Sequence, residues 1–192
     1  MIIFDKYELH GDYHWQDYGG DNDYTRHVDY LVEWIGEGHI ATDITASGRL
    51  LDIGAGDGLI TSKFKNCLGV ESSSLAVELA HNHNANVTTG SAYNLPASDK
   101  LVGSILFGDV LEHLEFPALA LSEARRVLTD DGSLYIAVPP WVYMETISKY
   151  HYREYTEQTL KESVEQCGFV LDGEMYEANT RIYAKFKKAD IT

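Results

Sequence analysis

Three glycines at alternate positions follow a short apolar run and precede a helical pattern. The run covers residues 50–53 and is apolar except for Asp52, and the glycines are Gly54, Gly56 and Gly58. Gly54 permits a tight turn, whereas Gly56 and Gly58 leave room for a ligand to approach the backbone where a Cβ would intrude. The N-terminus of the helix that follows favours a negatively charged group on that ligand. The pattern therefore predicts a turn that binds a cofactor.

The spacing of these glycines distinguishes between two cofactor classes. The dinucleotide fingerprint G-x-G-x-x-G/A requires Gly or Ala at position 59, where this chain has Leu59. The spacing found in this chain, G-x-G-x-G, does not meet that requirement and resembles the spacing of the second class, the proteins that bind S-adenosylmethionine. A nicotinamide-dependent oxidoreductase is therefore disfavoured.

The glycine turn resembles the first motif of the class I S-adenosylmethionine-dependent methyltransferases, and later segments follow in that family's order. These segments are Gly69–Glu71, Gly90–Pro96, Phe107–Leu114, Arg126–Leu134 and Tyr155–Phe169. The resemblance covers residues 49–188 and is nearest to small UbiE/UbiG-like enzymes that methylate small molecules. It implies S-adenosyl-L-methionine as the cofactor and S-adenosyl-L-homocysteine as the product.

The resemblance also implies which residues bind the cofactor. Glu71, at the end of a strand, would accept hydrogen bonds from the two ribose hydroxyls. Ser91 stands where the family usually has an acid that accepts from the adenine amino group, and a neutral hydroxyl forms a weaker hydrogen bond there. Asp52 could contact the methionine ammonium group or only brace the glycine turn. The complete cofactor-binding set is Asp52, Gly54, Gly56, Gly58, Glu71, Ser72, Ser91, Ala92 and Asp109.

Two histidines, His113 and His151, are the candidate general bases, because an imidazole titrates near neutral pH. In some relatives, an E-x-x-E-H segment holds a divalent metal, and the corresponding residues here are Asp109, Glu112 and His113. Such oxygen-rich ligation would suit Mg²⁺. The alternative is that Glu112 and His113 only brace the start of a helix. We favour this second interpretation, with no metal bound.

Aromatic residues cluster between residues 7 and 34 and again between residues 141 and 155. Both segments are expected over the carboxyl ends of the strands, where ligands bind in this type of fold. We interpret them as the acceptor pocket and its lid, and aromatic faces also attract a sulfonium. The residues expected to face the ligand are His14, Trp15, Tyr18, Trp141 and Tyr152. Tyr30 and Trp34 are instead expected to pack a helix onto the sheet.

Short apolar runs alternate with helical patterns from Arg49 onward. The expected strands are 49–53, 67–71, 86–89, 102–107 and 133–138, and the expected helices are 59–65, 74–82, 117–128 and one from Thr156 to Gly168. Two closing strands, 169–174 and 181–187, are joined by 176–180 and should pair antiparallel. The order predicts a Rossmann-like α/β fold with a mostly parallel, seven-stranded sheet, a C-terminal antiparallel hairpin and helices on both faces.

The chain is expected to comprise two parts. Residues 1–40 form an aromatic arm and a helix over 24–35, which together serve as the lid. Residues 41–192 form the core that binds S-adenosylmethionine. We expect a monomer or a homodimer.

The charge narrows the range of partners. The formal net charge is −15, and such an acidic surface repels phosphate backbones and anionic lipids. No apolar stretch approaches the length of about 20 residues that a membrane span needs, and the start of the chain lacks the features of a signal peptide. We therefore expect a cytoplasmic protein with no nucleic acid or membrane partner.

The function expected from these features is methyl transfer to a small-molecule acceptor, most simply to a hydroxyl oxygen. Two alternatives stay open: transfer to the nitrogen of a small amine, and a catalytically silent module that binds S-adenosylmethionine and regulates a partner.

Overall fold

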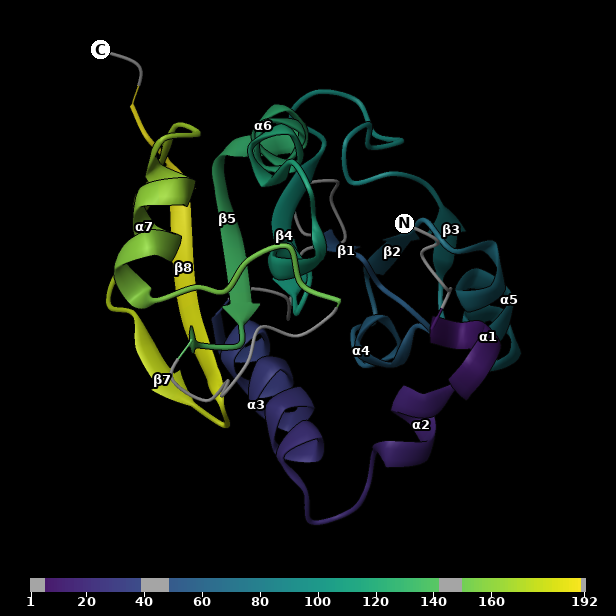
Figure 1. The fold of residues 1–192 in the computed structure, drawn as a ribbon. Coiled ribbons are helices and arrows are strands. Elements are labelled where there is room, and N and C mark those ends of the chain that lie inside the picture. The colour runs from purple at the N-terminus through teal and green to yellow at the C-terminus, as the bar shows by residue number, and fades with distance from the viewer. Residues whose placement is uncertain (1–5, 39–48, 142–149, 191–192) are drawn as a thin grey trace.

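A computed structural model describes residues 6–38, 49–141 and 150–190 and is built around one β-sheet (Figure 1). The strand order is β3-β2-β1-β4-β5-β8-β6, with β7 paired to β8. β1 to β5 run parallel, and β8 is antiparallel to β5, β6 and β7. The strands are β1 Leu50–Ile53, β2 Cys67–Glu71, β3 Val87–Thr89, β4 Val102–Gly108, β5 Leu128–Val138, β6 Phe169–Leu171, β7 Tyr176–Ala178 and β8 Arg181–Lys188. This confirms the Rossmann-like α/β fold with antiparallel C-terminal strands.

The sheet differs in two details from the expected seven strands. Among the described residues it has eight strands, because Tyr176–Ala178 is a short strand that pairs with β8 rather than a plain connection. β5 also begins at Leu128, directly after a helix and five residues before the expected start. Leu128 pairs with Val102, and the register then shifts so that Ser133 pairs with Ser104.

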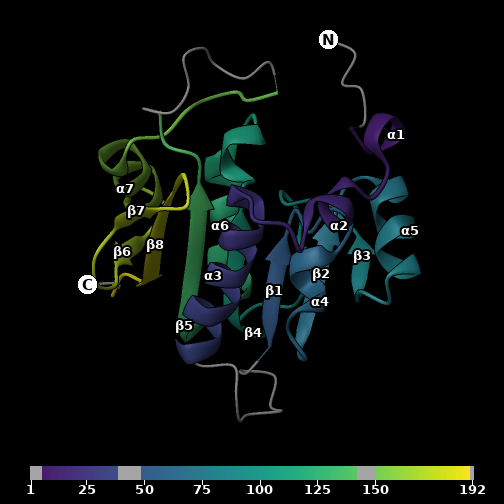
Figure 2. The ribbon, with the colours of Figure 1, turned by 90° about the horizontal axis from the view of Figure 1, so that it is seen from below.

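Helices cover both faces of the sheet (Figure 2). α3 (Asp23–Gly38) and α4 (Leu59–Ser62) lie on one face, where Leu31 and Ile35 of α3 pack against Tyr135 of the sheet. α6 (Pro117–Val127) and α7 (Glu157–Glu165) lie on the other face, and α5 (Ser74–Asn82) packs against β3 at the edge. Each helix thus buries one apolar stripe against the sheet, as an amphipathic helix must.

Local sequence explains where the two helices of the second face begin. α6 starts with Pro117, whose missing N–H costs nothing in the first turn of a helix. α7 starts after Thr156, whose hydroxyl accepts from the Thr159 N–H in a capping box, as expected for an N-cap residue. No helix in the described part of the chain combines the length and the apolar character that crossing a membrane requires.

The N-terminal segment before α3, for which the sequence predicted an aromatic arm without helices of its own, contains two short helices. α1 covers Lys6–His10 and α2 covers Tyr13–Asp17. In Figure 2, the arrowheads of β1, β2 and β5 point toward the side on which α1 and α2 lie. The expected boundary between arm and core at residue 40 falls outside the described residues, but α3 before it already contributes fully buried side chains to the core.

Gly58 has a different structural role from the one that its place in the motif suggested. It precedes α4 with a φ of +80°, and a Cβ at this position would lie 2.5 Å from the Cβ of Ala85 and 2.8 Å from that of Ala80. Gly58 therefore permits close packing of the turn against α5 and β3. The space left by its missing Cβ is filled by Ala80 and Ala85 and not open to a ligand.

We expect Gly58→Ala to lower the free energy of unfolding by about 1–3 kcal/mol more than a matched control, because the new methyl group overpacks this contact. The control is Gly173→Ala, where φ is +99° but nothing lies within 4 Å of the added Cβ. Urea denaturation of both variants measures the difference. Equal destabilisation would contradict the packing role of Gly58.

Candidate functional site

A cavity of 1260 Å³ lies at the carboxyl ends of the parallel strands. Its wall includes the residues that follow successive strands: Gly54 after β1, Glu71 at the end of β2, Gly90 after β3, Asp109 after β4 and Pro139 after β5. Sites for one drug-sized ligand occupy about 300–1,000 Å³, so this cavity has room for a cofactor and a second small molecule.

Most residues expected to bind the cofactor line this cavity. The lining includes Asp52, Gly54, Glu71, Ser72, Ser91, Ala92 and Asp109. Gly56 and Gly58 belong to the same turn but are not among the lining residues. The sequence motifs thus converge on one place in the fold, although their members have different local roles.

The Glu71 carboxylate joins the glycine turn to the end of β2. One oxygen accepts from the Gly56 N–H at 3.0 Å, and the other accepts from the Ser73 N–H at 2.8 Å and from the Ser72 hydroxyl at 3.1 Å. A carboxylate offers about four acceptor positions, so these three bonds leave one for a ligand hydroxyl.

Asp52 is buried at the floor of the cavity, and its carboxylate accepts from the Thr61 hydroxyl at 2.7 Å. Burial raises the pKa of Asp52 to about 6, the Thr61 hydrogen bond opposes that shift, and the Glu71 charge adds to it. The sequence left two roles open for Asp52, a contact to the methionine ammonium group or a brace for the glycine turn. The hydrogen bond to Thr61 provides the brace, because it joins β1 to α4.

Gly56 faces the N-terminal arm. A Cβ at Gly56 would lie 2.2 Å from the hydroxyl oxygen of Tyr7, which belongs to α1 and is buried. Burial raises the pKa of Tyr7 well above its ordinary value, and the nearby Tyr13, Glu71 and Asp57 add to the shift. Tyr7 thus contacts the glycine turn, a role that no motif in the sequence indicated.

Asp57 holds α2 over the glycine turn. Its carboxylate is fully buried and accepts from the His14 backbone N–H at 3.1 Å, with His14 Nδ1 at 2.9 Å from the other oxygen. Its backbone carbonyl accepts from Trp15 Nε1 at 2.9 Å. His14 lines the cavity as a result, and the arm is attached to the turn by a buried polar contact.

Trp15, Tyr18 and Trp141, which were expected to face the ligand, are not among the residues that line the cavity. Trp15 stacks on His83 with ring centroids 4.1 Å apart, and the Tyr18 hydroxyl donates to Asp29 at 2.7 Å. Trp141 is 48% exposed. Tyr152, the remaining member of the expected set, does line the cavity.

Asp109 is paired with Arg181, which the sequence analysis did not single out. The two guanidinium nitrogens lie 2.6 and 2.8 Å from the two Asp109 oxygens. Burial would raise the pKa of Asp109, but the Arg181 charge outweighs it and keeps that pKa below its usual range. Arg181 comes from β8, 72 residues further along the chain, so only the antiparallel pairing of β8 with β5 brings it to the site.

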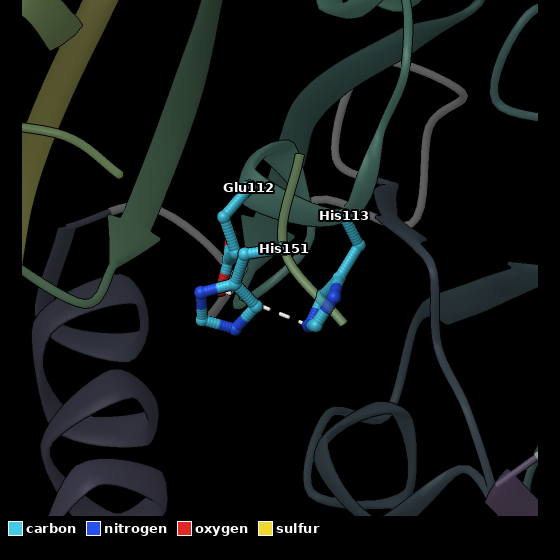
Figure 3. A group of neighbouring side chains, drawn as sticks. All are labelled: Glu112, His113 and His151. Carbon is cyan, nitrogen blue, oxygen red and sulfur yellow. Dashed lines mark ion pairs between the residues drawn. The ribbon is translucent and has the colours of Figure 1, made fainter. Parts of the chain in front are cut away.

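Glu112, His113 and His151 form a cluster beside the cavity (Figure 3). Their ligand atoms lie within 4.8 Å of one another, and the two imidazole rings meet edge to face with centroids 4.7 Å apart. The sequence analysis had instead grouped Glu112 and His113 with Asp109. The structure replaces Asp109 with His151, because Asp109 turns to Arg181.

Burial shifts the pKa values in this cluster. It raises the pKa of Glu112 well above its ordinary value, and the Asp109 charge adds to that shift. It lowers the pKa of His113, against the hydrogen bond from this ring to the Tyr150 carbonyl. Both groups therefore favour their neutral forms in the absence of a further charge.

Comparison with known proteins agrees with this geometry. The profile of a family described as "Methyltransferase domain" matches residues 51–136. An uncharacterized 37.1 kDa protein in transposon TN4556 of Streptomyces fradiae is 33% identical over 113 residues, which cover 53% of this chain and 33% of that protein. The chain therefore spans one third of the length of this curated relative.

Two solved structures are similar in fold. A protein of Thermotoga maritima, described as an S-adenosylmethionine-dependent methyltransferase and possible histamine N-methyltransferase, has a TM-score of 0.64 and 23% identity, over 73% of this chain and 81% of that one. The magnesium protoporphyrin IX methyltransferase of Synechocystis, solved with S-adenosylhomocysteine, has a TM-score of 0.67 and 16% identity, over 96% of this chain and all of that one.

One histidine that lines the cavity, His27, makes the free energy of unfolding depend on pH. His27 of α3 is buried, its Nδ1 lies 2.8 Å from the Tyr183 hydroxyl, and burial lowers its pKa to about 4. The unfolded chain binds a proton at this histidine below pH about 6.5, whereas the folded protein does not until pH about 4. The contribution of His27 to stability is therefore complete above pH 6.5 and decreases as the pH falls toward 4.

We expect the wild-type protein to lose about 2 kcal/mol of unfolding free energy relative to His27→Gln between pH 7 and pH 5, since the variant lacks this titration. Urea denaturation at both pH values measures the change. The control, His10→Gln, alters an exposed histidine and should follow the wild type. If the His27→Gln and wild-type stabilities changed in parallel with pH, His27 would not be buried in its neutral form.

Proposed function

We propose that this chain is a class I S-adenosylmethionine-dependent methyltransferase that transfers a methyl group from S-adenosylmethionine to a hydroxyl oxygen of a small molecule. The match of a methyltransferase domain over residues 51–136 and the fold shared with solved S-adenosylmethionine-dependent methyltransferases support this assignment. One observation carries the proposal. The glycine turn, Glu71 and the Gly90–Ala92 segment converge on a single large cavity that also reaches His113 and His151. The cavity thus joins a cofactor end to an end where an acceptor can react.

The cofactor end is assigned from hydrogen-bonding capacity. The free acceptor position of Glu71 suits a ribose hydroxyl, and Ser72, Ser91 and Ala92 lie on the same side of the cavity for the adenine. Asp52 in β1 and Gly54 after it lie on the side of β2 that faces away from β3, and we place the methionine part of the cofactor there. Acidic side chains along this path suit a cofactor with a positively charged sulfur and ammonium group.

The chemistry needs little from the protein beyond alignment and the exclusion of water. A lone pair of the acceptor oxygen forms a bond to the methyl carbon, and the bond from that carbon to sulfur breaks with its electrons left on S-adenosylhomocysteine. The acceptor's hydroxyl proton must leave. We propose that His113 and His151 act on this proton, because their rings lie together on the cavity wall.

The charge of the chain bears on the acceptor. A formal net charge of −15 disfavours a nucleic acid and favours a small acceptor that is neutral or cationic. Tyr13, Tyr24 and Tyr152 add aromatic surface to the lining, which suits an acceptor with an apolar body. We therefore propose a small hydroxylated molecule.

The affinity for S-adenosylmethionine tests the proposed role of Glu71. Glu71→Ala should weaken S-adenosylmethionine binding about 10-fold or more in calorimetry, because hydrogen bonds to a charged group contribute about 1.5–3 kcal/mol. Glu78→Ala, which removes an exposed carboxylate of α5, is the matched control and should bind as the wild type does. Equal affinity of both variants would remove Glu71 from the cofactor site.

The second prediction concerns transfer. With labelled S-adenosylmethionine and a panel of small hydroxylated and amine acceptors, we expect labelled O-methyl products identified by mass spectrometry. His113→Ala and His151→Ala should each lower turnover about 100-fold or more and leave cofactor affinity unchanged, whereas His10→Ala should retain the wild-type rate.

The other outcomes separate the alternatives. Products methylated only at nitrogen would make the protein an N-methyltransferase. Tight cofactor binding with no product from any acceptor would favour a silent regulatory module. Full turnover in both histidine variants would show that neither ring acts on the acceptor's proton.

A further inference from the structure

A cluster beside the cavity brings together two imidazole nitrogens and one carboxylate oxygen within 4.8 Å of one another. They belong to Glu112, His113 and His151. Glu112 and His113 belong to the short 3-10 turn Leu111–His113 after β4, and His151 lies in the segment before α7. The Tyr152 N–H donates to the Glu112 carbonyl at 2.8 Å, so the backbone itself holds the two segments together. Figure 3 shows the three side chains gathered in one place.

Hydrogen bonds orient both imidazole rings for a ligand at Nε2. His113 Nδ1 lies 2.9 Å from the Tyr150 carbonyl oxygen, which can only accept, so Nδ1 carries the proton and Nε2 keeps its lone pair. His151 Nδ1 lies 2.8 Å from a carboxylate oxygen of Glu154. A carbonyl or a carboxylate on the second ring nitrogen is the arrangement that usually accompanies metal-ligating histidines.

The third side chain lacks a partner that it needs. Glu112 is only 1% exposed, and its Oε2 has no hydrogen-bond partner among the described residues. Its other oxygen lies 4.0 Å from His113 Nε2. A buried, unpaired carboxylate oxygen is costly, and a cation bound between this oxygen and the two rings would remove the cost.

We propose that Glu112, His113 and His151 bind a divalent transition metal, Zn²⁺ in the first place. Two imidazoles and one carboxylate suit Zn²⁺ better than Mg²⁺, which prefers oxygen ligands. Ligand atoms around a tetrahedral zinc lie about 3.4 Å apart, so the present set needs only a small convergence of side chains. This reverses the preference drawn from the sequence, because His151 replaces Asp109 as the third ligand.

Three protein ligands leave a fourth position open toward the cavity. If the proposed methyl transfer is correct, that position binds the acceptor's hydroxyl oxygen and lowers its pKa, as a bound dication does for a coordinated oxygen acid. With both Nε2 atoms on the ion, the histidines would act by holding the metal, and the proton of the coordinated hydroxyl would leave to water as the methyl group is transferred. The acceptor class is accordingly a molecule that presents an oxygen, rather than an amine, to the metal.

The test uses the complete, metal-free protein without cofactor or acceptor. Isothermal titration with Zn²⁺ should give one site per chain, and Co²⁺ in its place should give the absorption bands of a bound, low-symmetry ion. Glu112→Gln and His151→Gln, which keep the size of the side chain or nearly so, should each weaken Zn²⁺ binding about 10-fold or more. His10→Gln controls for surface histidines and should bind as the wild type does.

Unchanged Zn²⁺ affinity in Glu112→Gln and His151→Gln would overturn the proposal, as would binding of Mg²⁺ but not Zn²⁺. Circular dichroism of each variant confirms that it is folded. S-Adenosylmethionine affinity, measured on the same preparations, separates the two proposals. Cofactor binding without a zinc site would refute only the metal, and a zinc site without cofactor binding would refute only the proposed function.

Discussion

The parallel pairing of β1 with its two neighbours is the constraint on which the rest of the structure depends. Ile53 lies level with Val70 of β2 and with Phe107 of β4. The residues that come next in each strand therefore emerge at the same edge of the sheet, and they include the glycine turn and Glu71. Packing on both buried faces maintains this register, because a slip of one residue would move each side chain to the opposite face and disrupt its close packing there. The cavity is a consequence of that register.

Carboxylates gather around the cavity, and each is stabilised differently. Asp52 accepts from Thr61, Asp57 accepts from the arm at His14, and Asp109 pairs with Arg181. Glu112 alone among these four has a buried oxygen without a hydrogen-bond partner in the described part of the chain. Since a buried carboxyl oxygen without a partner is costly, this contrast supports the cation that we propose at Glu112.

The sequence predicted the fold that surrounds the cavity, but not the contacts that the N-terminal arm makes. The glycine turn, the helix after Thr156 and the succession of strands and helices along the chain follow from patterns that are local in the chain, such as turn residues, caps and apolar runs. The contacts of Trp15 and Tyr18 do not, because an aromatic side chain that packs on a loop has the same sequence signature as one that faces a ligand. Arg181 was missed for a related reason, since its partner lies far away in the chain.

The sequence by itself determined the fold class, the end of the parallel strands at which the cavity lies and the cofactor family, because glycine spacing and strand ends are properties of short segments. Only the tertiary structure decided which side chains share a site. It placed Asp109 on Arg181 and His151 beside Glu112 and His113. The physical reason is that an ion pair or a ligand set depends on distances in space, which are set by the pairing of strands and the packing of segments that are remote in the sequence.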